Sequence, residues 1–370
     1  MRVKLEEVCK RIYAGGDVPK DRYSEVKTKK YPIPIYANAE KDNGLYGYTD
    51  KAREEELSIT VAARGTIGFT AIRREPFLPV VRLITVVPDT EKVSERYLYY
   101  VLKKCKPQSS GTSIPQLTVP DIKKNRLELY DISEQERIAD QLDKVSKVIE
   151  LRKQELEALD NLIKARFVEM FGDPVVHLYK GETVKLDTIA DKITVGFVGE
   201  ASNEYVDEGV PYLRTQNIRV NRIDLKGLIY VNESFHNKNQ KSIIHPGDVV
   251  ISRVGANRGM AAMVPDSLPE ANIANCLIVG QTDNINSYYL AFYMNMSFGK
   301  RPQFGASVGS AQGVVNTSIL KKWEVYVPDR KLQDDFFEFS NQVDKSKVAV
   351  QKALKETQLL FDSLMQQYFG

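Results

Sequence analysis

The sequence predicts a protein of the α+β class, with mixed α/β composition, in which two tandem globular domains are joined by two long antiparallel coiled-coil helices. Three observations support this prediction. Residues 109–172 match residues 307–370 without a gap, so that Phe171-Gly172 falls on Phe369-Gly370. Each copy ends in a long stretch with helical periodicity, and short β-rich runs bounded by glycine and proline precede both stretches. An internal repeat of this kind indicates that the same architecture was built twice.

Composition and charge are those of an ordinary globular protein. The chain has 370 residues, 42% hydrophobic and 27% charged, enough for two or three domains. A net charge of +3 does not by itself indicate a nucleic-acid partner, although basic residues cluster locally. Cys9, Cys105 and Cys276 have no disulfide or metal-site spacing, which favours a reducing compartment. Because neither a leader segment nor an apolar stretch of about 18 residues is found, we expect a cytoplasmic protein.

Residues 1–132 are expected to form the first globular domain. It opens with a short amphipathic piece, Leu5–Ile12. The run Leu57–Arg64, which alternates over Ser58–Val61, predicts a strand and ends in an arginine- and glycine-containing turn, Arg64–Gly68. A tyrosine-rich helical piece, Tyr97–Leu102, follows.

Residues 133–173 are predicted to form the first long helix. Ser133 is a suitable N-cap, and Glu136 stands at the capping-box position three residues later. Apolar residues recur at alternating spacings of about four and three, which is coiled-coil spacing, and Arg152 interrupts them. Gly172 and Pro174 end the helix. The predicted seam consists of Ile138, Leu142, Val145, Ile149, Leu156, Leu159 and Ile163.

Residues 174–329 repeat the plan of the first domain, and residues 330–370 repeat the helix. The run Gly247–Arg253 and the turn Arg253–Gly259 correspond to the first strand and its turn, and Tyr288–Tyr293 to the tyrosine-rich piece. An isolated helix with such an apolar stripe would be poorly soluble, so we expect the two helices to pair with each other. Coiled coils between two chains are the alternative. The second seam consists of Phe336, Val343, Val350, Leu354, Phe361 and Leu364, with polar interruptions at Ser340, Lys347 and Thr357.

Motifs of the common nucleic-acid enzymes are absent from the sequence. A phosphate-binding loop would need Gly-Lys-Ser/Thr, and Gly299-Lys300-Arg301 does not supply it. The Asp/Asn-Pro-Pro-aromatic tetrapeptide of amino-methyltransferases is also missing, and so is a glycine-rich cofactor loop after a strand. Pro88-Asp89 is interpreted as a turn at a strand end, because its spacing to Glu91-Lys92 does not suit a nuclease. We therefore expect a chain that catalyses nothing and binds neither metal nor cofactor.

Several segments resemble the specificity subunits of type I restriction–modification systems. In the first half these are Ser109–Thr112, Ile114–Leu117 and Glu134–Arg137, and in the second half Pro211–Ile218 and Gly247–Arg253. The resemblance implies a non-catalytic subunit that recognises double-stranded DNA with a bipartite site. Each target-recognition domain would read one half-site, while the helices set the spacer and dock two modification subunits. Those subunits would carry S-adenosylmethionine, and restriction subunits would use ATP and Mg²⁺. The second copy departs from the pattern, because Pro328–Gln333 lacks the Glu-Gln pair.

Candidate DNA-binding residues follow from the chemistry of base reading, which needs side chains with two-point hydrogen bonding. In the first domain they are Lys29, Lys30, Arg64, Thr66, Arg73, Ser110, Thr112 and Gln116. In the second they are Arg214, Gln216, Asn217, Arg219, Arg253, Asn257, Arg258, Ser310 and Gln312. Three alternatives stay open: a coiled-coil scaffold that does not bind DNA, an enzyme with an unrecognised site, and a solitary specificity subunit that serves methylation only.

Overall fold

The computed structural model describes residues 1–105, 116–174, 176, 178–297 and 315–370. The chain divides into two compact units. Unit 1 comprises Met1–Gln154 with Gln351–Gly370, and unit 2 comprises Glu155–Val350. Each unit therefore combines one globular domain with one half of each long helix. The finer division into 1–132, 133–173, 174–329 and 330–370 stays a prediction.

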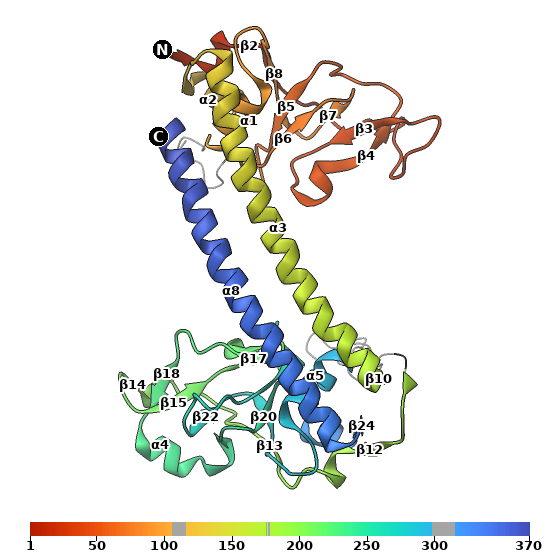
Figure 1. The fold of residues 1–370 in the computed structure, drawn as a ribbon, viewed down its shortest axis with the longest axis vertical. Helices are drawn as coiled ribbons and strands as arrows, with labels where there is room; N and C mark the ends of the chain where they lie inside the picture. Colours follow the sequence, from red (N-terminus) through yellow and green to blue (C-terminus); the bar gives the residue numbers. More distant parts are fainter. Residues whose placement is uncertain (106–115, 175, 177, 298–314) are drawn as a thin grey trace. The chain divides into compact units, whose positions relative to one another are not determined.

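The framework of unit 1 is an antiparallel sheet of four strands covered by a helix (Figure 1). Its order is β2-β8-β5-β6, and Ile59, Val61, Ile84 and Val86 pack in one core with Tyr97 of the helix. A separate two-stranded ribbon joins the chain's first strand to the strand before the first long helix. The elements are β1 (Arg2–Lys4), β2 (Cys9–Ala14), β5 (Ser58–Val61), β6 (Thr70–Arg73), β8 (Ile84–Pro88), β9 (Arg126–Glu128), α1 (Glu95–Lys103) and α2 (Val119–Lys124), with a 3-10 turn at Leu5–Glu7.

Unit 2 repeats this framework. The sheet order β13-β23-β20-β21 matches that of unit 1, and β12 pairs with β24 as β1 pairs with β9. The duplicated α+β architecture predicted from the repeat is therefore confirmed. The elements are β12 (Thr183–Lys185), β13 (Ile193–Val195), β20 (Val249–Ser252), β21 (Ala261–Met263), β23 (Cys276–Val279), β24 (Glu324–Tyr326), α5 (Ser287–Ser297) and α7 (Thr317–Lys321), with a 3-10 turn at Leu186–Thr188.

Each unit also carries a second sheet, which is the smaller one in unit 1 and has five strands in unit 2. In unit 1 the order is β4-β3-β7, formed by Leu45–Thr49, Ile33–Tyr36 and Leu78–Pro79, with a turn at Lys41–Gly44. In unit 2 the equivalent order β18-β15-β22 gains β14 and β19 at its edges. The central pairs β3–β7 and β15–β22 are both parallel. The elements of this lobe in unit 2 are β14 (Tyr205–Val206), β15 (Val210–Leu213), β16 (Ile218–Arg219), β17 (Arg222–Ile223), β18 (Ile229–Val231), α4 (Glu233–Lys238), β19 (Ile243–Ile244) and β22 (Ala271–Ile273), with 3-10 turns at Ser202–Glu204, Thr215–Asn217 and Gln240–Ser242.

The long helices are α3 (Ile132–Phe171) and α8 (Arg330–Phe369). In unit 1, Tyr368 donates to Gln141 Oε1 at 2.6 Å. In unit 2, Lys347 Nζ lies 2.7 Å from Asp160 Oδ1. Residues late in α8 thus meet residues early in α3, and the reverse, so the helices run antiparallel as predicted. The thirteen seam positions named above are buried or half-buried.

The start of α3 differs from the prediction, because Asp131 caps the helix and Ser133 does not. Asp131 Oδ1 accepts hydrogen bonds from the backbone N–H of Glu134 at 2.9 Å and from the hydroxyl of Ser133 at 2.6 Å. Glu136 does not close a capping box, since its carboxylate accepts from Arg96 Nη1 at 2.8 Å. Asp131 is the N-cap because its side-chain oxygen accepts a hydrogen bond from a backbone N–H of the first turn, that of Glu134.

A buried glutamine joins each long helix to its globular domain, and sequence reasoning missed this role. Gln135 accepts from the backbone N–H of Ser94 at 2.9 Å and donates to the carbonyls of Lys92 and Tyr130. Its counterpart, Gln333, accepts from the N–H of Asn286 and donates to the carbonyl of Pro328, both at 2.8 Å. The signal was present in the sequence, because both glutamines occupy the same position of the repeat.

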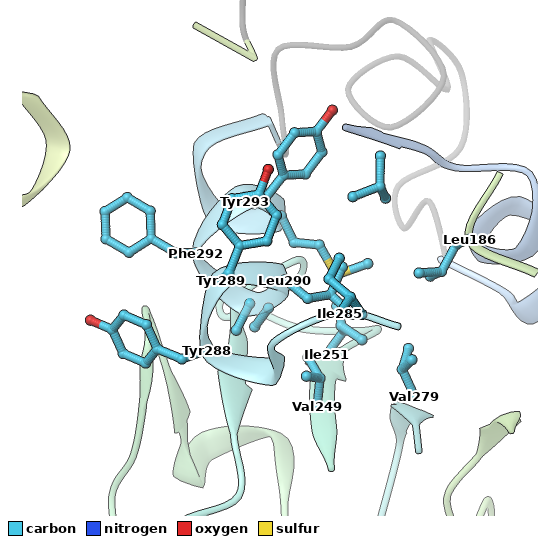
Figure 2. Packing of buried hydrophobic residues seen from close by; sticks show 14 of the residues in the cluster. Leu186, Val249, Ile251, Val279, Ile285, Tyr288, Tyr289, Leu290, Phe292 and Tyr293 are labelled. Carbon is cyan, nitrogen blue, oxygen red and sulfur yellow. The ribbon is translucent and has the colours of Figure 1, made fainter. Parts of the chain in front are cut away.

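The largest core cluster lies in unit 2 and is rich in aromatic residues (Figure 2). Tyr288, Tyr289 and Phe292 project from α5 above Val249 and Ile251 of β20. Phe167 of α3 lies fully buried, with its ring centroid 5.1 Å from that of Phe292 and 5.3 Å from that of Phe336 of α8. In this unit, α3 and α8 therefore contribute side chains to the same hydrophobic core as α5 and β20.

Candidate nucleic-acid interface

In unit 1 the structure brings together Arg64, Thr66 and Gln116. The turn between β5 and β6 is shaped by Gly65 and Gly68, whose φ angles are +67° and +86°. Arg64 donates through Nη2 and Nε to Gln116 Oε1 at 2.8 and 3.1 Å. Arg64 and Thr66 are exposed, and Gln116 is half-buried. A guanidinium held in this way presents its remaining N–H groups outward.

Arg73 has a structural role, which corrects the expectation that it contacts DNA. Its side chain is 3% exposed. It donates to Thr60 Oγ1 at 3.1 Å and to the carbonyl of Asn43 at 2.7 Å, and its guanidinium lies 3.6 Å from the centre of the Tyr36 ring. Burial lowers the pKa of Arg73. The residue ties β6 to the smaller sheet, and nothing in a local strand pattern reveals that contact.

The remaining candidates of the first domain lie elsewhere. Lys29 and Lys30 are exposed on a separate loop, residues 25–32, where Lys30 Nζ lies 5.1 Å from the ring centroid of Tyr31. Ser110 and Thr112 fall outside the described residues, as do Ser310 and Gln312 in the second domain.

In unit 2 two turns are braced against each other. The amide nitrogen of Asn257 donates to the carbonyls of Thr215 and Ile218, each at 3.1 Å. Asn217 is 3% exposed, accepts from the N–H of Arg214 at 2.9 Å and donates to the carbonyl of Asp224 at 3.0 Å. Asn217 is therefore a structural residue and not a base reader, which corrects its assignment. The side-chain amide of Asn257 likewise donates its N–H groups to backbone carbonyls of the same unit.

Arg214 and Arg253 are the cations that this bracing positions. They follow directly on β15 and β20, and the segment at Ala274-Asn275 lies between them. The N–H of Ala274 donates to the carbonyl of Leu213 at 2.8 Å, and the N–H of Arg253 donates to that of Asn275 at 3.3 Å. Both arginines are half-buried, and their Nε atoms are buried without a hydrogen-bond partner among the described residues.

Each of these arginines acts electrostatically on one buried neighbour, Arg253 on Cys276 and Arg214 on Tyr212. Burial raises the pKa of Cys276, and the charge of Arg253 opposes that shift. Burial raises the pKa of Tyr212 to about 12, and Arg214 opposes it. An orphaned buried N–H is costly, which favours an acceptor supplied from outside the chain.

Three further candidates surround this pair. Gln216 is exposed, and Arg258 is half-buried in the turn that also holds Asn257. Arg219 has a side chain 41% exposed, with Nη2 4.0 Å from Asp224 Oδ2. The structure thus gathers Arg214, Gln216, Arg219, Arg253 and Arg258 near two adjacent turns.

Arg64 and Arg253 do not occupy equivalent positions. The inward residues Ile59 and Val61 of β5 correspond to Val249 and Ile251 of β20. Gly65 then corresponds to Gly255, whose φ is +76°, and Gly68 to Gly259, whose φ is +85°. In this register Arg253 stands where the first repeat has Ala63, one residue before Arg64, and the second turn is one residue longer.

The described residues contain no group of three or more His, Cys, Asp or Glu arranged to hold a metal ion. In the same part of the chain, no helix is long and apolar enough to cross a membrane. What the two turn regions offer chemically is a set of hydrogen-bond donors, dominated by guanidinium groups, on rigid strand ends.

Comparison with known proteins agrees with this architecture. The model of the type I restriction modification DNA specificity domain matches residues 1–161 and 180–358. Because these two matches cover most of the chain, the protein belongs to the family of type I restriction–modification specificity subunits.

Individual relatives are similar over part of their length. A Mycoplasma pneumoniae protein predicted to be a type I specificity subunit, S.MpnORF507P, is 34% identical over 165 residues, which cover 42% of this chain and 45% of that protein. The chain thus spans about half the length of the curated relatives it matches first.

Two solved structures share the fold. The S subunit of a type I system from M. genitalium has a TM-score of 0.58 at 15% identity, covering 100% of this chain and 96% of the other. A chain from a study of complex assembly and conformational transition of the type I R-M system has a TM-score of 0.60 at 17% identity, covering 100% and 97%.

Proposed function

We propose that this chain is the sequence-specific DNA-recognition subunit of a type I restriction–modification complex, in which each domain reads one half of a bipartite site. The observation that supports the proposal is that the two units share a structural framework but differ in the turns that carry the candidate DNA-binding residues. The four-stranded sheets and the glutamine junctions are the same in both units, while the turns after β5 and β20 differ in length and residues. Two copies of one scaffold with different donor sets suit two different half-sites.

Base reading is assigned to the turn arginines. An arginine can donate two parallel hydrogen bonds to the O6 and N7 atoms of guanine, and each such pair is worth about 1–3 kcal/mol of discrimination. Arg64 serves the first half-site in this proposal, supported by Gln116. Arg214 and Arg253 serve the second, because both follow directly on strands and their buried Nε atoms lack a partner among the described residues. Lys29, Lys30 and Arg219 are assigned to phosphates, which are contacted without regard to sequence.

The helix pair is assigned to setting the spacer. A helix rises about 1.5 Å per residue and duplex DNA about 3.4 Å per base pair, so a helical connection fixes how many base pairs go unread. The outward faces of α3 and α8, including Lys153, Glu157 and Lys352, are exposed. They would dock two modification subunits, which supply S-adenosylmethionine, and restriction subunits would supply ATP hydrolysis. The chain itself is non-catalytic in this proposal.

The test is methylome sequencing of cells that co-express the chain with a modification subunit. The expected result is one bipartite methylated motif with a fixed unread gap. Arg253→Ala should relax or abolish one half-site and leave the other, while Arg64→Ala should affect the opposite half. Arg137→Ala is the matched control, because Arg137 pairs with Glu134 on α3 and should leave both unchanged. If Arg253→Ala weakens both half-sites equally, Arg253 contacts the backbone and its assignment is wrong.

A further inference from the structure

In unit 1 the turn between β7 and β8 has a backbone conformation that its central residues disfavour. Val81 and Arg82 have φ angles of +54° and +62°, and the N–H of Leu83 donates to the carbonyl of Val80 at 3.0 Å. Left-handed backbone at both central positions is the feature of a type I′ turn, which favours asparagine and glycine. A β-branched residue such as valine is poorly suited to it. Val81 is 46% exposed and Arg82 is also exposed, so burial of these side chains does not compensate for the strain.

Backbone hydrogen bonds show which part of unit 2 corresponds to this turn. Two such bonds are made at equivalent places in the two repeats. They run from the N–H of Val80 to the carbonyl of Tyr36 at 2.9 Å and from that of Val81 to Gly16 at 2.8 Å in unit 1, and from the N–H of Ala274 to Leu213 at 2.8 Å and from that of Asn275 to Phe197 at 3.0 Å in unit 2. Val81 therefore corresponds to Asn275, whose φ is +51°. The turn lies at the junction where unit 2 positions Arg214 and Arg253.

Arg82 is an additional residue that the second repeat lacks. The residues that follow are equivalent, because each accepts at its carbonyl from the glycine N–H directly after β2 or β13. These bonds run from Gly15 to Leu83 and from Gly196 to Cys276, both at 2.8 Å. Cys276 directly follows Asn275, whereas Arg82 stands between Val81 and Leu83.

Unit 1 presents a different cation at this junction. Arg214 follows Leu213 and therefore corresponds to Ala37, which follows Tyr36. In the register described above, Arg253 corresponds to Ala63. Small apolar side chains thus stand where the second repeat has its two arginines, and the inserted Arg82 supplies the guanidinium instead. Within the described residues, Arg82 has neither a hydrogen bond nor an ion pair, so its donors are available to a ligand.

The turn that holds Arg82 is braced to the turn that holds Arg64. The side chain of Asn38 accepts from the N–H of Ala63 at 2.7 Å and donates to the carbonyl of Val81 at 2.5 Å. In unit 2 the corresponding backbone groups bond to each other directly. The two exposed arginines of unit 1 therefore start from backbone segments that Asn38 holds together.

We propose that Arg82 reads a guanine of the first half-site, together with Arg64. This inference rests on the proposed function and adds a residue to it. Guanine is the base whose O6 and N7 atoms accept two parallel hydrogen bonds from an arginine. A base is favoured over a phosphate because an exposed side chain is kept here in a disfavoured backbone conformation, fixed by hydrogen bonds. A phosphate can be contacted from many positions and does not require this geometry.

In the first test, Arg82→Ala and Arg82→Lys are each co-expressed with the modification subunit, and the methylome is sequenced. In Arg82→Ala we expect the preference for guanine at one position to fall about tenfold, in the half-site that Arg253→Ala leaves unchanged. Arg82→Lys should show the same loss, because lysine is a point charge and cannot donate the paired hydrogen bonds. Arg126→Ala, at an exposed position of β9, removes the same charge and should leave the motif unchanged.

The second test separates base reading from folding. Arg82→Gly introduces the residue that this backbone conformation favours, so the urea midpoint of the chain alone, followed by circular dichroism, should be equal or higher. The guanine preference of its complex should nevertheless fall as it does in Arg82→Ala. A lower midpoint would show that Arg82 stabilises the turn and would overturn the proposal.

Three results of the first test would also contradict the proposal. Uniformly weaker methylation of all sequences, restored by Arg82→Lys, would assign Arg82 to a phosphate. Loss of the modification subunit from the complex would place the turn at a protein interface, and an unchanged motif would show that Arg82 reads no base. A wild-type complex without a bipartite motif refutes the proposed function and this inference with it, whereas a bipartite motif that Arg82 does not influence refutes this inference alone.

Discussion

Replacing the junction glutamines should destabilise the two units separately and by different amounts. Gln135 is fully buried and makes three hydrogen bonds with backbone groups, to Ser94, Lys92 and Tyr130. Gln333 makes two such bonds, to Asn286 and Pro328. A buried backbone group that loses its partner costs about 1–3 kcal/mol. With partial compensation by the added apolar surface, we expect Gln135→Leu to lower the free energy of unfolding by about 3 kcal/mol and Gln333→Leu by about 2 kcal/mol.

The chain contains a reporter that separates the two effects. Its single tryptophan, Trp323, is buried in the core of unit 2, so its fluorescence follows that unit. Far-ultraviolet circular dichroism follows both. In urea, with a slope of about 2 kcal/mol per molar, Gln333→Leu should lower the fluorescence midpoint by about 1 M. Gln135→Leu should lower only the dichroism transition of unit 1, by about 1.5 M.

Two results would refute this reasoning. If Gln135→Leu shifts the fluorescence midpoint as much as the dichroism, the units do not unfold independently. If neither variant shifts either midpoint by more than the control Gln154→Leu, at an exposed position of α3, the glutamines are not structural junctions.

Three further predictions concern the core, the seam and the thiols. Phe167→Ala should destabilise unit 2 by about 3–5 kcal/mol, seen in the tryptophan transition, because its buried ring packs against five other aromatic rings. Arg152→Leu should change the unfolding free energy by less than about 1 kcal/mol, because apolar contacts of the leucine with the seam compensate for the lost hydrogen bonds to Ala353 and Thr357. A larger loss of stability in urea unfolding would contradict this. Burial raises the pKa of Cys9 and of Cys105 to about 12, which disfavours the thiolate at pH 8. Both thiols should therefore react with a disulfide reagent only after unfolding, and fast labelling of the native chain would count against it.

The long helices and the repeat could be predicted from sequence because their signals extend over many residues. The seam from Ile138 to Ile163 and its second copy recur with a period that only a helix satisfies. The sequence predicts the first cap two residues too late, because Asp131 and Ser133 are both suitable caps and only the backbone path decides between them.

The site was harder to predict, because burial at a turn depends on distant segments. Arg73 reads as an exposed strand end in sequence, yet Tyr36 and Asn43 from the smaller sheet enclose it. The sequence predicts Asn217 and Asn257 as base readers, but asparagines in turns often bond to nearby backbone groups, as both do here. Arg64, in the turn after β5, is exposed, whereas Arg214 and Arg253, directly after β15 and β20, are half-buried.

The register of the two turns leads to a prediction about the DNA. Where the first repeat has Ala63 and Arg64, the second has Arg253 and Val254, and the second turn is one residue longer. Arg64 lies three residues after the end of β5, whereas Arg253 follows β20 directly, so the two guanidiniums start from different positions of the turn. If the turns read bases, as we propose, the two half-sites should differ in sequence and in the position of the contacted guanine. A methylated motif whose halves are inverted copies of each other would show that these turns do not determine the site.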